Sequence, residues 1–416
     1  MRLIIYTGKG GTGKTVVSCS TGIALADKKY RTIIISSDPA HTLGDAFQIS
    51  KNKDEKYDKN IDVSDDDDEY IDQIIPNLHI LQVDPIREMS KKYNNILSYM
   101  ASLLSSRGID ETLSYELAMM PGMTQLFALL KVEEVIRNDS FDVIILDMPA
   151  SGEALRYLYF PKLIGGIGKK LTGLMGSFSS FSKLFQSFLG LSLPDNSIFK
   201  YEEELFSRLD YLSELVRDNT VTSLRLIANP DTFSIENAKR SLMSANLYGV
   251  NVDLVIINKI MPNIAHDSGN DVSNEYYENW RKFQVTKVEE AKINFYPLPV
   301  KEVYLYDKEL AGLVTLRANA NKIFGNEDPS GIFYDGKPYS IFQDNSNSLR
   351  IILKVPFTKS GSFDIKRSGS EVLIKIKTVT GFLVNVIPLP LITFNMDMVN
   401  AELDNGILTL TFEKST

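Results

Sequence analysis

The sequence predicts an α/β protein with a mostly parallel sheet flanked by helices, followed by a smaller all-β module. Three observations lead to this prediction. Short apolar runs of strand type alternate with segments of helical pattern through most of the chain. A glycine-rich turn directly follows the first of these runs. After about Phe324 the helical pattern stops, and only strand-like runs remain.

The expected strands of the sheet are spaced widely enough for helices to lie between most of them. The first strand covers Leu3 to Thr7, and a helix from about Gly13 to Lys28 follows the glycine turn. Parallel strands need crossover connections, so this alternation predicts a mostly parallel sheet. The other expected strands are Thr32–Ser36, Leu78–Val83, Phe141–Leu146, Leu224–Ala228, Val252–Ile257 and Lys292–Tyr296.

The composition is that of a soluble globular protein with two or three domains. The chain has 416 residues, of which 44% are apolar and 24% charged. Its net charge of −8 argues against a nucleic-acid partner, which requires basic residues against phosphates. Neither a signal-peptide pattern nor an apolar stretch of the ~18 residues that a membrane span needs occurs, so we expect a cytoplasmic protein.

The chain has one cysteine and three histidines, which limits the metal chemistry available to it. The single cysteine, Cys19, excludes an internal disulfide and any multi-cysteine zinc or metalloid site. It lies in the helix after the glycine turn and is expected to be a buried apolar residue. The histidines, His41, His79 and His266, are too scattered to predict a metal site.

Two apolar segments, at about 90–138 and 158–200, are expected to form an inserted helical subdomain. The first contains Met119, Met120 and Met123. Such stripes are more often core, but the Gly and Ser content and the methionines favour an adaptable surface for a hydrophobic partner. Six apolar residues of the second segment recur at three- and four-residue steps and would line one helix face: Leu171, Leu174, Phe178, Phe181, Phe185 and Phe188.

Two further segments differ in composition from the α/β part. Residues 51–73 carry the acidic run Asp65–Glu69 and are expected to be a solvated insertion. Residues 324–338 read as a linker, and 339–416 as a β-sandwich. The strands expected in the sandwich are Ser348–Val355, Glu371–Thr378, Leu383–Pro388 and Gly406–Phe412.

The glycine turn has the pattern G-x-x-x-x-G-K-[ST] between a strand and a helix, which predicts the phosphate-binding loop of a P-loop NTPase. Lys14 is expected to reach the β- and γ-phosphates, and the Thr15 hydroxyl to bind Mg²⁺. We therefore expect ATP and Mg²⁺ as cofactors. The expected nucleotide contacts of the loop are Gly8, Gly10, Gly11, Thr12, Gly13, Lys14, Thr15 and Val16.

An additional lysine, Lys9, follows the first glycine of the loop, as in deviant Walker A ATPases. Further motifs occur in the order found in ArsA/Get-type ATPases, which include a targeting factor for tail-anchored membrane proteins. The chain resembles this family over about residues 1–322. The motifs are the switch I-like Ser37–Leu43, the switch II-like Asp147–Arg156, and the adenine-pocket-like segments Ile257–Ile260 and Pro297–Val303.

The resemblance implies roles for individual residues around the phosphates. Asp38 would position or deprotonate the attacking water, and Asp147 would hold Mg²⁺ through water. Asp45 would be a further carboxylate near the metal. Lys9 would reach the nucleotide of a second subunit, which implies a homodimer.

For the base, the resemblance implies that Asn258 reads the adenine edge, and that Pro297 and Pro299 shape the pocket. Two departures from the family pattern concern switch II. Here Met148-Pro149-Ala150 replaces the usual T-A-P, and Glu153 replaces a histidine. The coupling of hydrolysis to conformational change is therefore expected to differ in detail.

The resemblance implies a chaperone or targeting ATPase that binds hydrophobic membrane-protein segments, with a possible membrane receptor. An arsenical-pump ATPase is the first alternative, but soft trivalent arsenic needs thiolate ligands and only Cys19 exists. A nucleotide-gated scaffolding protein is the second. The segment Ala401–Lys414 resembles the last strands of α-crystallin domains, so the β module is expected to be small heat-shock-like.

Overall fold

The computed structural model describes residues 1–37, 42–49, 71–84, 88, 123–148, 196–263, 272–345, 347–359, 361–369, 371–378 and 381–414. The chain divides into two compact units. The first comprises Met1–Thr7, Gly13–Val216 and Lys308–Gly331. The second comprises Gly8–Thr12, Arg217–Asp307 and Ile332–Thr416.

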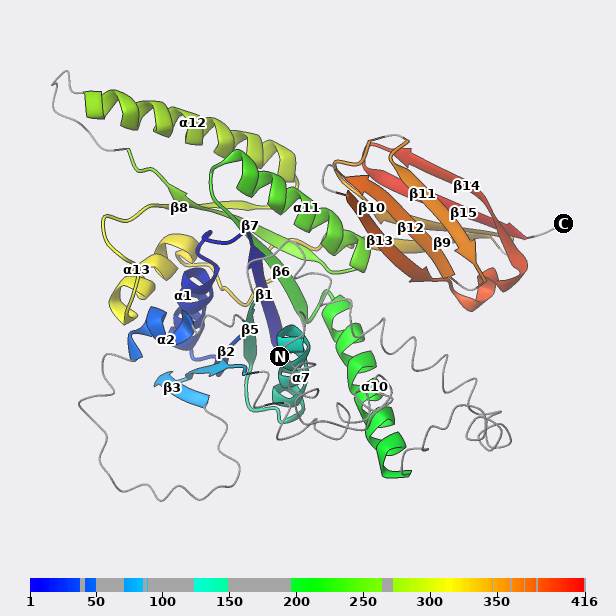
Figure 1. Ribbon diagram of the computed structural model, residues 1–416, viewed down its shortest axis with the longest axis horizontal. Coiled ribbons are helices and arrows are strands. Elements are labelled where there is room, and N and C mark those ends of the chain that lie inside the picture. Colours follow the sequence, from blue (N-terminus) through cyan, green and yellow to red (C-terminus); the bar gives the residue numbers. More distant parts are fainter. Residues whose placement is uncertain are drawn as a thin grey trace, which may run out of the picture. The chain divides into compact units, whose positions relative to one another are not determined.

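The α/β part is a large, mostly parallel sheet flanked by helices, as predicted (Figure 1). In the first unit the strand order is β3-β4-β2-β5-β1, and only β3 runs antiparallel to its neighbour. Strands β1, β2 and β5 are buried runs rich in Ile, Leu and Val, as expected of a sheet covered on both faces, whereas β3 is only partly buried. Their bounds are β1 Arg2–Gly8, β2 Thr32–Ser36, β3 Ile71–Ile75, β4 Leu78–Gln82 and β5 Val143–Asp147.

Helix α1 is the central helix of the first unit and packs on β2, β4 and β5. Helix α13 packs against α1, where Asn319 donates a 3.0 Å hydrogen bond to the Ser20 hydroxyl. Arg317 forms an ion pair with Asp27 at the end of α1. The helices are α1 Lys14–Asp27, α2 Thr42–Phe47, α7 Met123–Arg137, α10 Asn196–Arg217 and α13 Leu313–Phe324.

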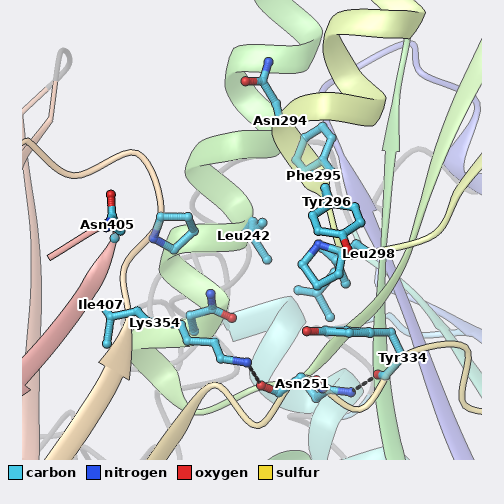
Figure 2. Close-up of a pocket in the computed structure, with 16 residues that line it drawn as sticks. Leu242, Asn251, Asn294, Phe295, Tyr296, Leu298, Tyr334, Lys354, Asn405 and Ile407 are labelled. Atoms are coloured by element: carbon cyan, nitrogen blue, oxygen red, sulfur yellow. Dashed lines mark hydrogen bonds between the residues drawn. The ribbon is translucent and has the colours of Figure 1, made fainter.

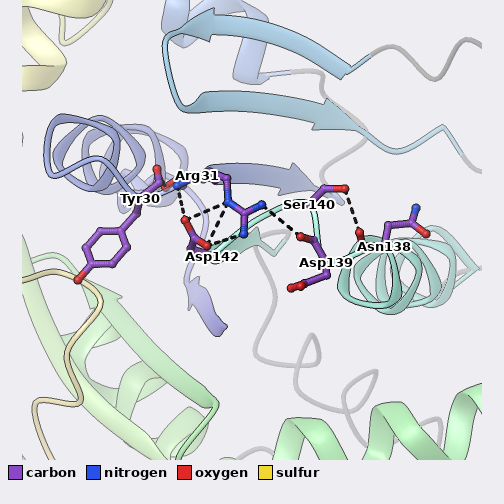
Figure 3. Close-up of polar contacts among 7 residues, drawn as sticks. Tyr30, Arg31, Asn138, Asp139, Ser140 and Asp142 are labelled. Atoms are coloured by element: carbon purple, nitrogen blue, oxygen red, sulfur yellow. Dashed lines mark hydrogen bonds and ion pairs between the residues drawn. The ribbon is translucent and has the colours of Figure 1, made fainter.

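The amino ends of β2 and β5 are joined by a fork-shaped ion pair (Figure 3). The Arg31 guanidinium donates to both carboxylate oxygens of Asp142, and it also donates to the Asp139 carbonyl. The hydrogen bond from Arg31 lowers the pKa of Asp142. The pair is half-exposed, so it is expected to add little to the stability of the fold. It does connect the starts of the two strands.

The second unit holds three parallel strands in the order β6-β7-β8, with helices α11 and α12 between them along the chain. Asp231 caps the start of α11 by accepting a hydrogen bond from the Ser234 backbone N–H. Gly249 ends the same helix in the left-handed conformation that glycine adopts without strain. The bounds are β6 Thr222–Ala228, α11 Thr232–Tyr248, β7 Val252–Ile260, α12 Val272–Phe295 and β8 Val300–Tyr304.

The strand predicted at Lys292–Tyr296 is wrong, because Lys292–Phe295 form the last turn of α12. Val288, Ala291 and Phe295 are buried at three- and four-residue spacing, whereas Ile293 is exposed. The short apolar run is therefore the buried face of a helix rather than a strand. The strand itself, β8, begins only after Pro299.

The residues after Phe324 form an antiparallel all-β region, as predicted. Two sheets, in the orders β14-β15-β10-β9 and β11-β12-β13, share one hydrophobic core. Strands β9, β11 and β14 were not predicted, and none of the three is a continuous buried apolar run. The bounds are β9 Tyr339–Asn345, β10 Ser348–Lys354, β11 Phe363–Ser368, β12 Glu371–Thr378, β13 Gly381–Pro388, the 3₁₀ turn Leu391–Asn395, β14 Met396–Asp404 and β15 Ile407–Lys414.

The core of the β module is completed by helix α11. Met243 and Leu247 of this helix belong to the same buried cluster as Ile351 and Phe412 of the strands. Asn385 of β13 also donates a hydrogen bond to the Leu247 carbonyl. The β module and α11 are therefore parts of one packed body within the second unit.

The segment before β9 is fixed to the amino ends of β6 and β7. Arg225 and Asp253 form a fully buried ion pair, and the Phe333 ring lies 4.9 Å from the Arg225 guanidinium carbon. The Phe333 N–H donates to Asp253, and Asn251 donates to the Tyr334 carbonyl. This part of the predicted linker is thus anchored to the α/β strands of its own unit. Among the described residues, no helix is both long and apolar enough to span a membrane.

Candidate functional site

The glycine loop connects β1 to α1, in the strand-to-helix context that the sequence predicted. A side chain at position 8 would clash, because a Cβ there would lie 2.1 Å from the Ile227 carbonyl oxygen. Gly11 and Gly13 have φ values of 77° and 88°, which residues with side chains rarely adopt. The loop conformation therefore depends on glycine at these three positions.

Two side chains from the end of β7 hold the outer side of the loop. Asn258 donates a 2.8 Å hydrogen bond to the Thr12 carbonyl, and Lys259 donates a 2.7 Å bond to the Gly11 carbonyl. The Thr12 hydroxyl in turn donates to the Lys9 carbonyl. These three hydrogen bonds hold the carbonyls of Lys9, Gly11 and Thr12 and so brace the loop.

Lys14 lies at the start of α1 with only 6% of its surface exposed. No acidic residue occupies the first turn of this helix. The helix N-terminus and a shielded ammonium group therefore combine to favour an anion at the loop. Thr15 and Val16 follow in the first turn and are half-buried.

Asp147 stands at the carboxyl end of β5, beside the first turns of α1. Its carboxylate is 1% exposed and accepts hydrogen bonds from the Thr15 hydroxyl at 2.8 Å and the Ser18 hydroxyl at 3.2 Å. Burial, and secondarily the Asp147 charge, raise the pKa of the Cys19 thiol well above its usual value. Cys19 is therefore a neutral buried residue, as expected from the sequence.

The Thr15 hydroxyl and the Asp147 carboxylate suit Mg²⁺, because hard cations take oxygen ligands and Mg²⁺ keeps several waters. These two groups would hold a Mg²⁺ ion whose other ligands are mostly water. Asp45 lies on α2 and is exposed. The described residues hold no group of three or more His, Cys, Asp or Glu side chains placed for a metal ion.

Pro297 and Pro299 do not lie where the sequence analysis expected them. They precede β8, whereas Asn258 stands near the carboxyl end of β7, and these two strands are parallel. Pro297 lines a separate pocket of about 280 Å³ with Tyr334, Lys354 and other residues of the second unit (Figure 2).

Several predicted site residues lie outside the described residues. These are Asp38 of switch I and the client-binding candidates Met119, Met120, Leu171, Leu174, Phe178, Phe181, Phe185 and Phe188. Met123 begins α7, but its side chain also lies outside the described set. The residues that follow it, Leu126, Phe127, Leu129 and Leu130, are buried. That part of the methionine-rich stretch is core.

Two residues near the loop were missed by the sequence analysis, namely Lys259 and Ser18. Lys259 has a φ of 62°, unusual for a residue with a side chain, and this turn directs its ammonium group to Gly11. The only sequence signal was its place beside Asn258. Ser18 lies one helical turn after Thr15, so the i, i+3 spacing places both hydroxyls on one face.

Comparison with known proteins agrees with this geometry. The profile of the anion-transporting ATPase family matches residues 1–325. The chain belongs to the anion-transporting ATPase family. As a member of that family it is an ATPase.

Individual relatives fall into two groups. A protein of Aquifex aeolicus, named "Putative arsenical pump-driving ATPase 1", is 32% identical over 90% of this chain and 92% of its own length. A "Putative arsenical pump-driving ATPase" of Chlorobaculum tepidum is 29% identical over 90% of this chain and 88% of its own. "ATPase get3" of Schizosaccharomyces pombe is 24% identical over 63% of this chain and 74% of its own.

The bacterial relatives align beyond the family profile. Residues 1–325 make up 78% of the 416-residue chain, so a match over 90% must include residues of the β module. The β module is therefore shared, at least in part, with these two relatives.

Proposed function

We propose that the chain is a homodimeric ATPase that uses ATP hydrolysis to control the binding of hydrophobic membrane-protein segments. Two observations support the ATPase half, namely the hydrogen bond between Thr15 and Asp147 at the start of α1 and the braced loop that precedes this helix in the chain. The client half is supported by the likeness to get3 ATPases and by the apolar stripe Leu171–Phe188.

In this proposal the residues of the chain divide the work of phosphoryl transfer. Lys14 and the loop N–H groups hold the phosphates, and Asp38 orients the attacking water. Thr15 and Asp147 would hold Mg²⁺, which supplies positive charge to the phosphate oxygens. Lys9, on the exposed part of the loop, would supply a second cation to the nucleotide of the partner subunit.

Asn258 has a structural task in the described site, since it binds the Thr12 carbonyl and the Lys259 N–H. One amide proton and one lone pair of this side chain are still available for adenine. Contact with the base thus remains a proposal for Asn258. The proposal does not extend to Pro297 and Pro299.

The alternative is an ATPase that drives an arsenical pump, which the printed names of the two bacterial relatives favour. The chain itself has one cysteine, buried against Asp147, and so offers no exposed thiolate to arsenite. Arsenite is therefore expected to leave the ATPase rate unchanged. A stimulated rate would favour the pump.

The test of the main proposal is co-expression with a protein carrying one C-terminal membrane-spanning helix. The full chain should co-purify with this client, and the nucleotide state should change how much client is retained. The Asp38→Asn variant should bind ATP without turnover and trap one state, whereas Lys14→Ala should not bind ATP. Failure to retain the client in any nucleotide state would refute the client half, while leaving the ATPase assignment intact.

The α-crystallin resemblance of the β module is likewise proposed. Its support is the antiparallel two-sheet arrangement and the tight turn at Asn405-Gly406, both of which have positive φ. A role in shielding clients would require binding to survive when the nucleotide site is disabled. Binding of the client to Lys14→Ala would support that role.

A further inference from the structure

Phe233 is an exposed aromatic residue on the first turn of α11, with 76% of its surface accessible. The turn around it is fixed by three hydrogen bonds. Asp231 accepts from the backbone N–H groups of Ser234 and Ile235, and the Ser234 hydroxyl accepts from the Asn229 N–H. A capped turn presents the ring in a defined direction, so its exposure is built into the fold.

The ring of Phe233 faces the signature lysine of the phosphate loop. The Lys9 ammonium lies 5.6 Å from the ring centroid, within the range of a cation–π interaction. Both residues belong to the second unit, and Lys9 itself is exposed. At an exposed site such a contact is worth about 0.5–1 kcal/mol.

We propose that Phe233 is a positioning residue that holds Lys9 over its own subunit, and that Lys9 must leave the ring before it can reach a partner's nucleotide. The trans role of Lys9 rests on the proposed homodimer. The ring then acts as a weak latch, because the contact costs little to break. It holds Lys9 over its own subunit until the phosphates bound to a second copy attract the ammonium group more strongly.

The first test examines the contact alone, in protein without nucleotide. An amine-reactive reagent is applied, and the modification of Lys9 is followed by mass spectrometry, with exposed Lys29 as internal reference. In Phe233→Leu the apolar bulk remains but the aromatic face is lost, so Lys9 should react about two- to fivefold faster. Phe233→Tyr keeps the face and should match the wild type. Equal Lys9 rates in the Leu variant and the wild type would overturn the latch.

The second test examines the release of Lys9 in the dimer. ATPase activity per subunit is measured against protein concentration, and the half-maximal concentration is compared between variants. Phe233→Leu should lower that concentration about two- to fivefold, because no latch has to open. Phe233→Tyr should leave it unchanged.

The outcomes separate the latch from the proposed dimer. A half-maximal concentration that rises in Phe233→Leu would mean that the ring belongs to the subunit interface, and the latch would be overturned. Activity independent of concentration in the wild type would instead remove the trans role of Lys9. In that case the Lys9 modification rates would still report whether the ring holds the lysine.

Discussion

The Thr15 hydroxyl donates a 2.8 Å hydrogen bond to Oδ2 of Asp147, although 132 residues separate them in the chain. The bond joins the first turn of α1 to the end of β5, at the place where parallel strands present their carboxyl ends. A hydroxyl that is bound to a carboxylate can exchange that partner for a metal ion. The pair therefore offers two oxygen groups that suit such an ion.

The first prediction concerns this pair. Thr15→Val keeps the shape of the side chain but leaves the buried Asp147 carboxylate with one fewer donor, which should cost about 1–3 kcal/mol of stability. Hydrolysis should fall by about 100-fold or more, because the metal loses a ligand. Thr15→Ser keeps the hydroxyl and is the matched control. Thermal unfolding and Mg²⁺ titrations of the ATPase rate would measure both effects, and a Val variant as active as the Ser variant would contradict them.

The second prediction concerns the brace on the outside of the loop. Asn258→Ala removes the bond to the Thr12 carbonyl, so the nucleotide affinity should fall about 2- to 10-fold. Lys259→Met should have a smaller effect, because Lys259 is exposed and its bond to Gly11 competes with water. Titration with a fluorescent ATP analogue would measure both affinities. A larger loss of nucleotide affinity in Lys259→Met than in Asn258→Ala would contradict the prediction that Asn258 contributes more to the brace.

The third prediction follows from the shared core of α11 and the β module. Leu247→Ala should destabilise the second unit by about 2–5 kcal/mol, because this leucine is 2% exposed among strand residues. Tyr276→Ala on α12 removes an exposed side chain and should change stability by about 0.5 kcal/mol or less. Chemical denaturation of the full chain would compare the two. Equal stability of both variants would show that the β module does not depend on α11.

A deletion after Phe324 follows the same reasoning. It would uncover Met243 and Leu247, so the remaining chain should aggregate or unfold at a lower temperature. Loss of client binding in such a truncation would therefore not identify the β module as the binding site. Point substitutions on its exposed strands are the better test.

The fourth prediction concerns the pH dependence of stability through His79 on β4. Burial lowers the pKa of His79, its Nδ1 has no hydrogen-bond partner among the described residues, and its ring packs edge-on against Phe141. In the unfolded chain histidine titrates near 6.5, so the unfolded state binds the proton more readily. Stability contributed by neutral His79 is thus present above about pH 6.5 and lost as the pH falls below it.

Replacing His79 by phenylalanine should remove the part of the pH dependence of stability that this histidine causes. The difference in unfolding free energy between the wild type and His79→Phe should change between about pH 7 and pH 5, by at most about 1.4 kcal/mol per pH unit for one proton. Urea unfolding at several pH values would show it. A constant difference over this range would mean that the histidine titrates equally in both states.

The sequence predicted the nucleotide loop and most buried strands because these depend on local patterns. Gly11 and Gly13 are required by backbone angles, and β2, β5 and β7 contain the apolar runs Ile33–Ile35, Val143–Leu146 and Leu254–Ile257. Short amphipathic pieces gave less information. The run Lys292–Phe295 could be read with either period, and only its burial against the neighbouring strand and helix decides for a helix.

Contacts between residues far apart in the chain were beyond the reach of local patterns. The bond from Lys259 to Gly11 depends on the left-handed backbone conformation of Lys259, which no sequence motif predicted. The packing of Leu247 into the β module depends on how two segments meet. Strands such as β14 were missed because a bulge between Met398 and Asn400 interrupts their alternation.

The burial of Cys19 has a practical consequence for measuring the conformational cycle. Since the chain has no other cysteine and this thiol is inaccessible and neutral, cysteines introduced on the surface should take up dyes or spin labels selectively. The native residue can remain in place, so the packing beside Asp147 need not be disturbed. Pairs of such labels could then follow nucleotide-driven motion in single molecules.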